Sequence, residues 1–102
     1  MKNKIPNELE IMRISIIMKV LSDASRLKIL FAINGKAKSV YDIQSCVNMS
    51  QSAVSHQLSL LRKAKIVETK RDGNRIFYSI KDKGIVKLLD LFNKTFNEGY
   101  NS

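Results

Sequence analysis

The sequence predicts a mostly α-helical fold with one small β-hairpin, because apolar residues recur at two different periods along the chain. Over most of the chain they follow the three-to-four-residue spacing of amphipathic helices. Over residues 66–80 the pattern changes to two strand-like segments separated by a turn that contains Gly73. The expected order is α-α-α-α-β-β-α, and the length of 102 residues fits one domain, residues 1–102.

The first two expected helices differ in how their apolar residues are placed. The first, residues 8–21, carries apolar side chains on more than one face, although a surface helix of a small monomer needs only one apolar stripe. This surplus indicates a second contact surface. The second helix is expected to begin at a cap formed by Ser22 or Asp23 and to end at the Asn34-Gly35 pair.

Residues 39–64 have the pattern of a helix-turn-helix. Ser39 and Asp42 fit a capping box, with Asp in place of the usual Glu, that opens a short helix ending near Val47. A tight turn of about three residues then leads to Ser50, which is expected to cap the next helix. Two short helices joined in this way form a helix-turn-helix.

The second helix of this pair has two chemically different faces when its residues are placed at ~100° intervals. One face is apolar and suits a core. The other carries short hydrogen-bonding and basic side chains with almost no acid, as suits contact with base edges in a DNA major groove; the alternative is a serine-rich solvated surface. The polar face comprises Gln51, Ser52, Ser55, His56, Ser59, Arg62 and Lys63.

Basic charge is concentrated at the end of this helix and in the hairpin. The chain has 18 Lys and Arg against 9 Asp and Glu, a net charge of +9, which predicts a polyanionic partner. Residues 62–83 hold eight basic and three acidic residues. The hairpin tip carries Lys70, Arg71 and Arg75, and we expect this wing, residues 66–80, to contact phosphates.

The last expected helix, residues 82–98, is amphipathic. Asp82 is expected to cap its first turn. Its apolar residues fall on one broad face at helical spacing. They are Ile85, Val86, Leu88, Leu89, Leu91, Phe92 and Phe96.

Several function classes are disfavoured by what the sequence lacks. No segment approaches the ~20 apolar residues that span a bilayer, and the first residues do not resemble a signal peptide, so we expect a cytoplasmic protein. The polar helix face and the basic wing predict that its polyanionic partner is double-stranded DNA. One cysteine and one histidine cannot form a disulfide or a zinc site within one chain. A histidine–cysteine or histidine–carboxylate constellation and a glycine-rich phosphate loop are also lacking, so neither an enzyme nor a cofactor is expected.

Three segments carry a resemblance to a known family: residues 21–30 (LSDASRLKIL), 50–58 (SQSAVSHQL) and 72–80 (DGNRIFYSI). With them the chain resembles the ArsR/SmtB family of bacterial transcriptional repressors over nearly its whole length. The resemblance implies a winged helix-turn-helix and a homodimer built from the first and last helices, residues 1–21 and 82–98. It also implies a pseudo-palindromic operator and an inducer that weakens DNA binding.

The chain departs from both well-known metal-ligand sets of that family. Where the family's third helix has a pair of cysteines, this chain has Ser39 and Tyr41. In the last helix both histidines are replaced and two carboxylates remain. The positions there are Asp82, Gly84, Thr95 and Glu98. Because transition-metal sites need nitrogen or sulfur donors, no metal site is expected, and the inducing signal stays open.

A few residues have roles that the sequence leaves open. Cys46 is expected to be a small buried residue, or else a thiol that forms an adduct or pairs across the dimer. Arg26 matches an arginine of the family, and its simpler interpretation is a surface ion pair with Asp23. Tyr41 is interpreted as core or hairpin packing. Gln57 falls inside the apolar face, where a hydrogen bond to backbone near the dimer axis is one interpretation. Two alternatives remain for the whole chain: a winged-helix protein-interaction module, and a metal- or redox-responsive repressor with non-standard ligands.

Overall fold

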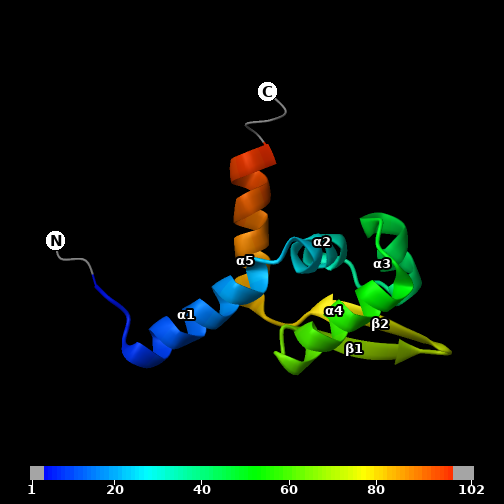
Figure 1. Ribbon diagram of the computed structural model, residues 1–102, viewed down its shortest axis with the longest axis horizontal. Helices are drawn as coiled ribbons and strands as arrows, with labels where there is room; N and C mark the ends of the chain where they lie inside the picture. Colours follow the sequence, from blue (N-terminus) through cyan, green and yellow to red (C-terminus); the bar gives the residue numbers. More distant parts are fainter. Residues whose placement is uncertain (1–3, 98–102) are drawn as a thin grey trace.

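The elements follow the expected order. The computed structural model describes residues 4–97. The elements are α1 (Glu8–Leu21), α2 (Ala24–Ile33), α3 (Val40–Val47), α4 (Gln51–Lys63), β1 (Val67–Asp72), β2 (Arg75–Ile80), α5 (Lys83–Phe92) and the π-helical turn η1 (Asn93–Asn97). Figure 1 shows α2, α3, α4 and the hairpin forming one body, from which α1 and α5 project in different directions.

Every α-helix within residues 4–97 begins at a residue whose side-chain oxygen accepts a hydrogen bond from a backbone N–H of the first turn. These N-caps are Asn7, Asp23, Ser39, Ser50 and Asp82. Ser22, the other candidate for α2, is instead the C-cap of α1. Because a cap satisfies donors that the helix itself leaves free, these five positions fix where the helices start.

The wing is an antiparallel hairpin in which Val67 lies opposite Ile80 and Asp72 lies opposite Arg75. Two residues therefore form its tip, one fewer than the expected turn, and Gly73 adopts a φ of 65° there. The loop before α3 extends this sheet at one point. Lys38 forms an isolated bridge with Tyr78, and their backbone N–H groups and carbonyls are joined at 2.8 and 3.0 Å.

The core lies between α2, α3, α4 and α5, and it is closed by the start of β1. Ile29, Ile43, Leu58 and Ile85 contribute one fully buried side chain from each of the four helices. Burying a side chain of this size stabilises the fold by about 1.5–3 kcal/mol. Helix α1 supplies a single buried residue, Leu21, so most of its apolar surface lies outside this core.

The last helix differs from its prediction in its second half. We expected a continuous helix over residues 82–98, but the α-helical part ends at Phe92 and the next five residues form the wider turn η1. Phe92 and Phe96 still contact each other there, with ring centroids 6.3 Å apart. Glu98 lies outside the described residues. None of the helices in residues 4–97 combines the length and the hydropathy that a membrane-spanning helix needs.

Candidate nucleic-acid interface

Helix α4 separates an exposed polar face from a buried apolar face. Val54, Leu58 and Leu61 are buried and attach the helix to the core. All seven residues expected on the polar face are exposed. They are Gln51, Ser52, Ser55, His56, Ser59, Arg62 and Lys63. The helix has no acidic residue in its first turn and two basic residues in its last, so the exposed face presents hydrogen-bonding groups and positive charge.

The boundary between the two faces differs from the helical-wheel prediction at Leu60. Helical spacing puts this residue on the apolar face with Val54, Leu58 and Leu61, yet it is 39% exposed. It borders a shallow hollow together with Ile16, Val20 and Arg26. The apolar face of α4 therefore continues toward α1 beyond the part that the core covers.

The turn between α3 and α4 determines where the polar face begins. Asn48 ends α3 in the left-handed conformation, with φ 44°, which the short polar side chain of asparagine tolerates. Ser50 then accepts from the backbone N–H of Ala53 at 3.1 Å and caps α4. Its hydroxyl also lies 3.3 Å from that of Ser52, so one of the expected base readers is oriented by the cap.

The three basic residues of the wing are exposed, but they do not share one face of the hairpin. Side chains alternate between the two faces of a strand, and residues opposite each other share a face. Lys70, Asp72 and Arg75 therefore lie on one face, because Asp72 pairs with Arg75. Arg71, opposite Ile76, lies on the other face. The tip thus presents basic charge in two directions.

Tyr41 is an exposed residue beside the wing. Of the two expected places, the core is wrong, because Tyr41 is 72% exposed. It lines a hollow between α3 and the wing with Asn74, Arg75 and Ile76. A signal was available, because helical spacing places Tyr41 far from the buried Ile43 on the α3 surface.

Cys46 is also exposed, so the prediction of a buried cysteine is wrong. Two of the residues at the family's metal positions, Ser39 and Asp82, cap helices. Ser39 is buried and caps α3. The Oδ1 atom of Asp82 accepts from the backbone N–H groups of Gly84 and Ile85 at 2.9 and 3.2 Å. Within residues 4–97, no three His, Cys, Asp or Glu side chains form a group that could hold a metal ion.

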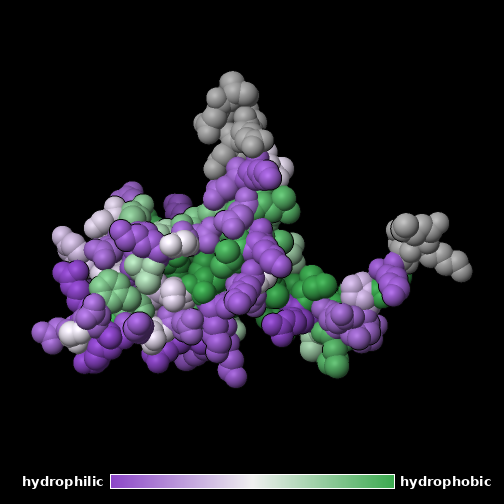
Figure 2. Space-filling model, turned by 180° about the vertical axis from the view of Figure 1, so that it is seen from behind, coloured by the Kyte–Doolittle hydropathy of each residue, from purple (hydrophilic) through white to green (hydrophobic). Residues whose placement is uncertain are grey.

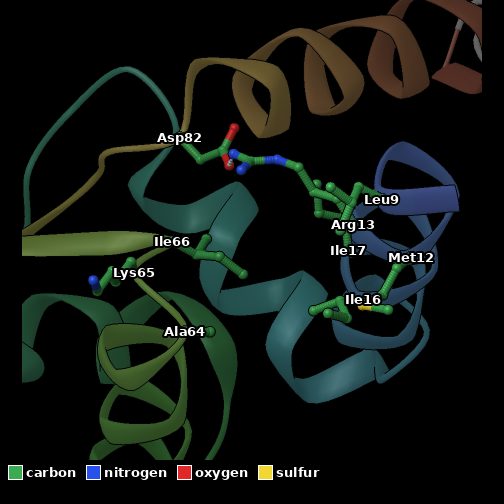
Figure 3. Close-up of a pocket in the computed structure, with 9 residues that line it drawn as sticks. All are labelled: Leu9, Met12, Arg13, Ile16, Ile17, Ala64, Lys65, Ile66 and Asp82. Atoms are coloured by element: carbon green, nitrogen blue, oxygen red, sulfur yellow. Dashed lines mark ion pairs between the residues drawn. The ribbon is translucent and has the colours of Figure 1, made fainter. Parts of the chain in front are cut away.

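An apolar cleft of about 530 Å³ lies between α1 and the segment that joins α4 to β1. Figure 3 shows Leu9, Met12 and Ile16 of α1 across from Ile66, with Arg13 reaching toward Asp82 at one side. The cleft has predominantly apolar walls, and it adjoins the exposed apolar residues of α1. The side of α1 that faces the body is therefore only partly covered.

Comparisons with known proteins agree with the fold. The model for bacterial regulatory proteins of the arsR family matches residues 23–69. The transcriptional repressor SdpR of Bacillus subtilis is 34% identical over 64 residues, which are 63% of this chain and 71% of SdpR. The transcriptional repressor SmtB homologue of Synechocystis sp. is 37% identical over 68 residues, 67% of this chain. The matched region spans about half of that relative, 52% of its length.

The structural similarity extends over almost the whole chain. The crystal structure of the AntR antimony-specific transcriptional repressor superposes with a TM-score of 0.87 and 28% sequence identity, covering 99% of this chain and 92% of AntR. The exposed polar helix and the basic hairpin thus belong to a fold shared with DNA-binding regulators. The chain belongs to the ArsR family of bacterial regulatory proteins.

Proposed function

We propose that this chain is a single winged helix-turn-helix domain that binds a pseudo-palindromic DNA operator as a homodimer and represses transcription in the cytoplasm. The observation that carries this proposal is the exposed face of α4, on which hydrogen-bonding and basic side chains occur without acids. A helix with this surface matches the size of the major groove and the donors and acceptors of base edges.

The face of α4 divides into two parts along the helix. Its N-terminal half carries Gln51, Ser52, Ser55 and His56, which read base edges because short polar side chains approach them closely. Its C-terminal half contacts phosphates or flanking bases, which position the helix in the groove. The residues of this second group are Ser59, Arg62 and Lys63.

The wing supplies contacts that do not depend on sequence. Lys70, Arg71 and Arg75 bind the phosphate backbone or the neighbouring minor groove. Their distribution over both faces of the hairpin suits a tip that enters a groove, because a phosphate strand then lies on each side of it. Such contacts increase affinity for all DNA and release counterions.

The dimer forms through α1 and α5. Large apolar side chains are exposed on both helices, and patches of this kind mark protein interfaces. They are Leu9, Ile11, Met12, Ile14, Ile16 and Met18 on α1, Leu91 on α5 and Phe96 in η1. In Figure 2 apolar surface gathers where these helices leave the body, while the wing side is mostly hydrophilic. A second copy that covers this surface places two α4 helices roughly 34–36 Å apart, one turn of DNA.

The repressor works without the family's usual metal ligands. The cysteine positions hold Ser39 and Tyr41, and the histidine positions of the last helix hold Gly84 and Thr95. Thiolate or imidazole donors, which transition metals prefer, are therefore missing from those places. The inducing signal stays open, and a zinc arm in the binding experiment tests whether other side chains of this chain respond to metal.

The test is binding of the purified protein to the DNA upstream of its own gene, measured by fluorescence anisotropy against a scrambled duplex at two salt concentrations. We expect operator binding to exceed scrambled binding by a factor of ~10³ or more. Zinc and a chelator should leave both affinities unchanged, and release by zinc would reveal a sensor with other ligands. Equal, weak binding to both duplexes would contradict the proposal and favour a protein-interaction module.

A further inference from the structure

Arg26 of α2 joins the end of α1 to the recognition helix α4. Its Nε donates to the carbonyl oxygen of Val20 at 2.9 Å, and its Nη2 donates to that of Lys19 at 3.4 Å. On the other side, its Nη1 donates to Oε1 of Gln57 at 3.4 Å. The expected pairing with Asp23 is replaced by a cap, in which Oδ2 of Asp23 accepts from the backbone N–H of Arg26 at 3.0 Å.

The side that faces α1 has a clear physical basis. The last carbonyls of a helix lack partners within the helix and form the negative end of its dipole, so a cation there is favourable. The planar fork of arginine can donate in several fixed directions at once, which a lysine ammonium on a flexible stem cannot reproduce. Arg26 is half-buried, and its bonds to Val20 and Gln57 lie in partly buried surroundings.

The hydrogen bond from Arg26 to α4 explains why a polar residue, Gln57, lies within the apolar face of that helix. Gln57 is half-buried and lies between the exposed His56 and the buried Leu58. Its side chain therefore lies at the border between the DNA-facing and core-facing surfaces. A rotation of α4 about its axis would move Gln57 relative to Arg26 and, by the same angle, turn the residues proposed to read bases.

We propose that Arg26 and Gln57 are positioning residues, which fix the orientation of α4 relative to α1 and thereby set affinity for the operator without contacting DNA. This inference rests on the proposed function. Because the partner subunit packs on α1, the angle between α1 and α4 determines how far apart the two recognition helices lie. A two-half-site operator reads that separation, whereas phosphate contacts on random DNA do not.

The test compares Gln57→Met and Arg26→Lys with two matched controls, Gln44→Met in α3 and Arg13→Lys in α1. Methionine keeps the length of glutamine without its amide, and lysine keeps the charge of arginine without its fork. We expect Gln57→Met, which removes one hydrogen bond, to bind the operator up to about tenfold more weakly. Arg26→Lys should lose at least as much, because it also disturbs the bonds to Lys19 and Val20. The double variant should be no weaker than the weaker single variant, because both remove the same contact.

Binding to the scrambled duplex distinguishes positioning from a general structural role. Loss of stability would weaken binding to both duplexes, whereas loss of positioning would weaken binding to the operator alone. We expect Gln57→Met and Arg26→Lys to bind the scrambled duplex within about twofold of the protein without substitutions, because phosphate contacts supply that affinity. Equal losses on both duplexes, accompanied by a lower melting temperature, would overturn the proposal in favour of a general stabilising role. Operator affinities that match those of the controls would overturn it as well.

A second measurement needs no DNA. Residual dipolar couplings of backbone amides report the angle between α1 and α4, and we expect this angle to change in Gln57→Met and in Arg26→Lys but in neither control. An unchanged angle would overturn the positioning role. If the protein without substitutions does not prefer its operator, the proposed function is contradicted, and so is the expected effect on operator affinity. The couplings still decide whether the hydrogen bond between Arg26 and Gln57 orients α4.

Discussion

Arg13 of α1 and Asp82, the N-cap of α5, form an ion pair with 3.8 Å between Nη2 and Oδ2. The two side chains differ in exposure, at 76% for Arg13 and 19% for Asp82. Water and salt screen the charge of the exposed partner, so the pair contributes little to stability. The same carboxylate also holds the first turn of α5 through two backbone N–H groups. The cap is therefore its main structural role.

Replacing Asp82 tests this assignment. We expect Asp82→Ala to lower the free energy of unfolding by about 1 kcal/mol, because the cap of α5 is lost. Asp82→Asn should lower it by less, since asparagine caps equally well and only the exposed ion pair is lost. Urea denaturation at one fixed protein concentration measures both values, because dimer stability depends on concentration. Equal costs for the two variants would assign the stability to the ion pair instead.

The recognition face predicts losses confined to the operator. We expect Ser55→Ala or His56→Ala to weaken operator binding by about 1–3 kcal/mol and to relax specificity, because base-edge contacts are removed. Anisotropy titrations against operator and scrambled duplexes measure the effect. Ser45→Ala, an exposed serine of α3 outside the proposed DNA and dimer surfaces, is the matched control. Unchanged operator affinity in both α4 variants would place base reading elsewhere on the chain.

The wing predicts losses on every sequence. Lys70→Ala or Arg71→Ala should weaken binding to operator and scrambled DNA alike and reduce the salt slope by about 0.9 for each phosphate contact removed. Lys87→Ala changes the charge equally but lies on α5, so it should leave the slope unchanged. Titrations over a series of salt concentrations provide the slopes. A variant that loses operator affinity alone would mean that the wing reads bases.

The features that the sequence predicted well are those fixed by residues close together in the chain. The caps at Ser39, Ser50 and Asp82 each accept from backbone two or three residues ahead, so a local pattern is sufficient to place them. The polar face of α4 likewise follows from helical spacing over a dozen residues. The ten candidate DNA contacts, seven on α4 and three on the wing, are all exposed. Their contact with DNA stays a prediction.

The features that the sequence did not predict depend on residues far apart in the chain or on small departures from regular geometry. Gln57 finds its partner 31 positions away in Arg26, and no local pattern indicates that contact. The bridge between Lys38 and Tyr78 is one residue long, too short for a strand signal. The spacing of Phe92 and Phe96 fits a regular helix, so the change to η1 after Phe92 leaves no trace in the apolar pattern.

The core predicts a large effect at Ile85. This residue is fully buried at the start of α5 and belongs to the same cluster as Ile29 and Leu58. We expect Ile85→Ala to lower the free energy of unfolding by about 2–5 kcal/mol, through lost burial and the cavity left behind. Ile85→Val should cost about 0.5–1.5 kcal/mol. Urea titrations rank the two variants, and equal small costs would mean that α5 is not part of the core.

The apolar surface of α1 predicts the oligomeric state. Met12 is 57% exposed and, together with Leu9 and Ile16, lines the apolar cleft between α1 and the segment that joins α4 to β1. We expect Met12→Glu to convert the dimer to a monomer in sedimentation equilibrium, because a carboxylate buried in an apolar interface loses its hydration without gaining a partner. Operator affinity should fall with it, since a monomer contacts one half-site. Ala24→Glu adds the same charge at an exposed position in the first turn of α2 and should remain dimeric. A Met12→Glu protein that dimerises as tightly as this control would show that the partner subunit packs elsewhere.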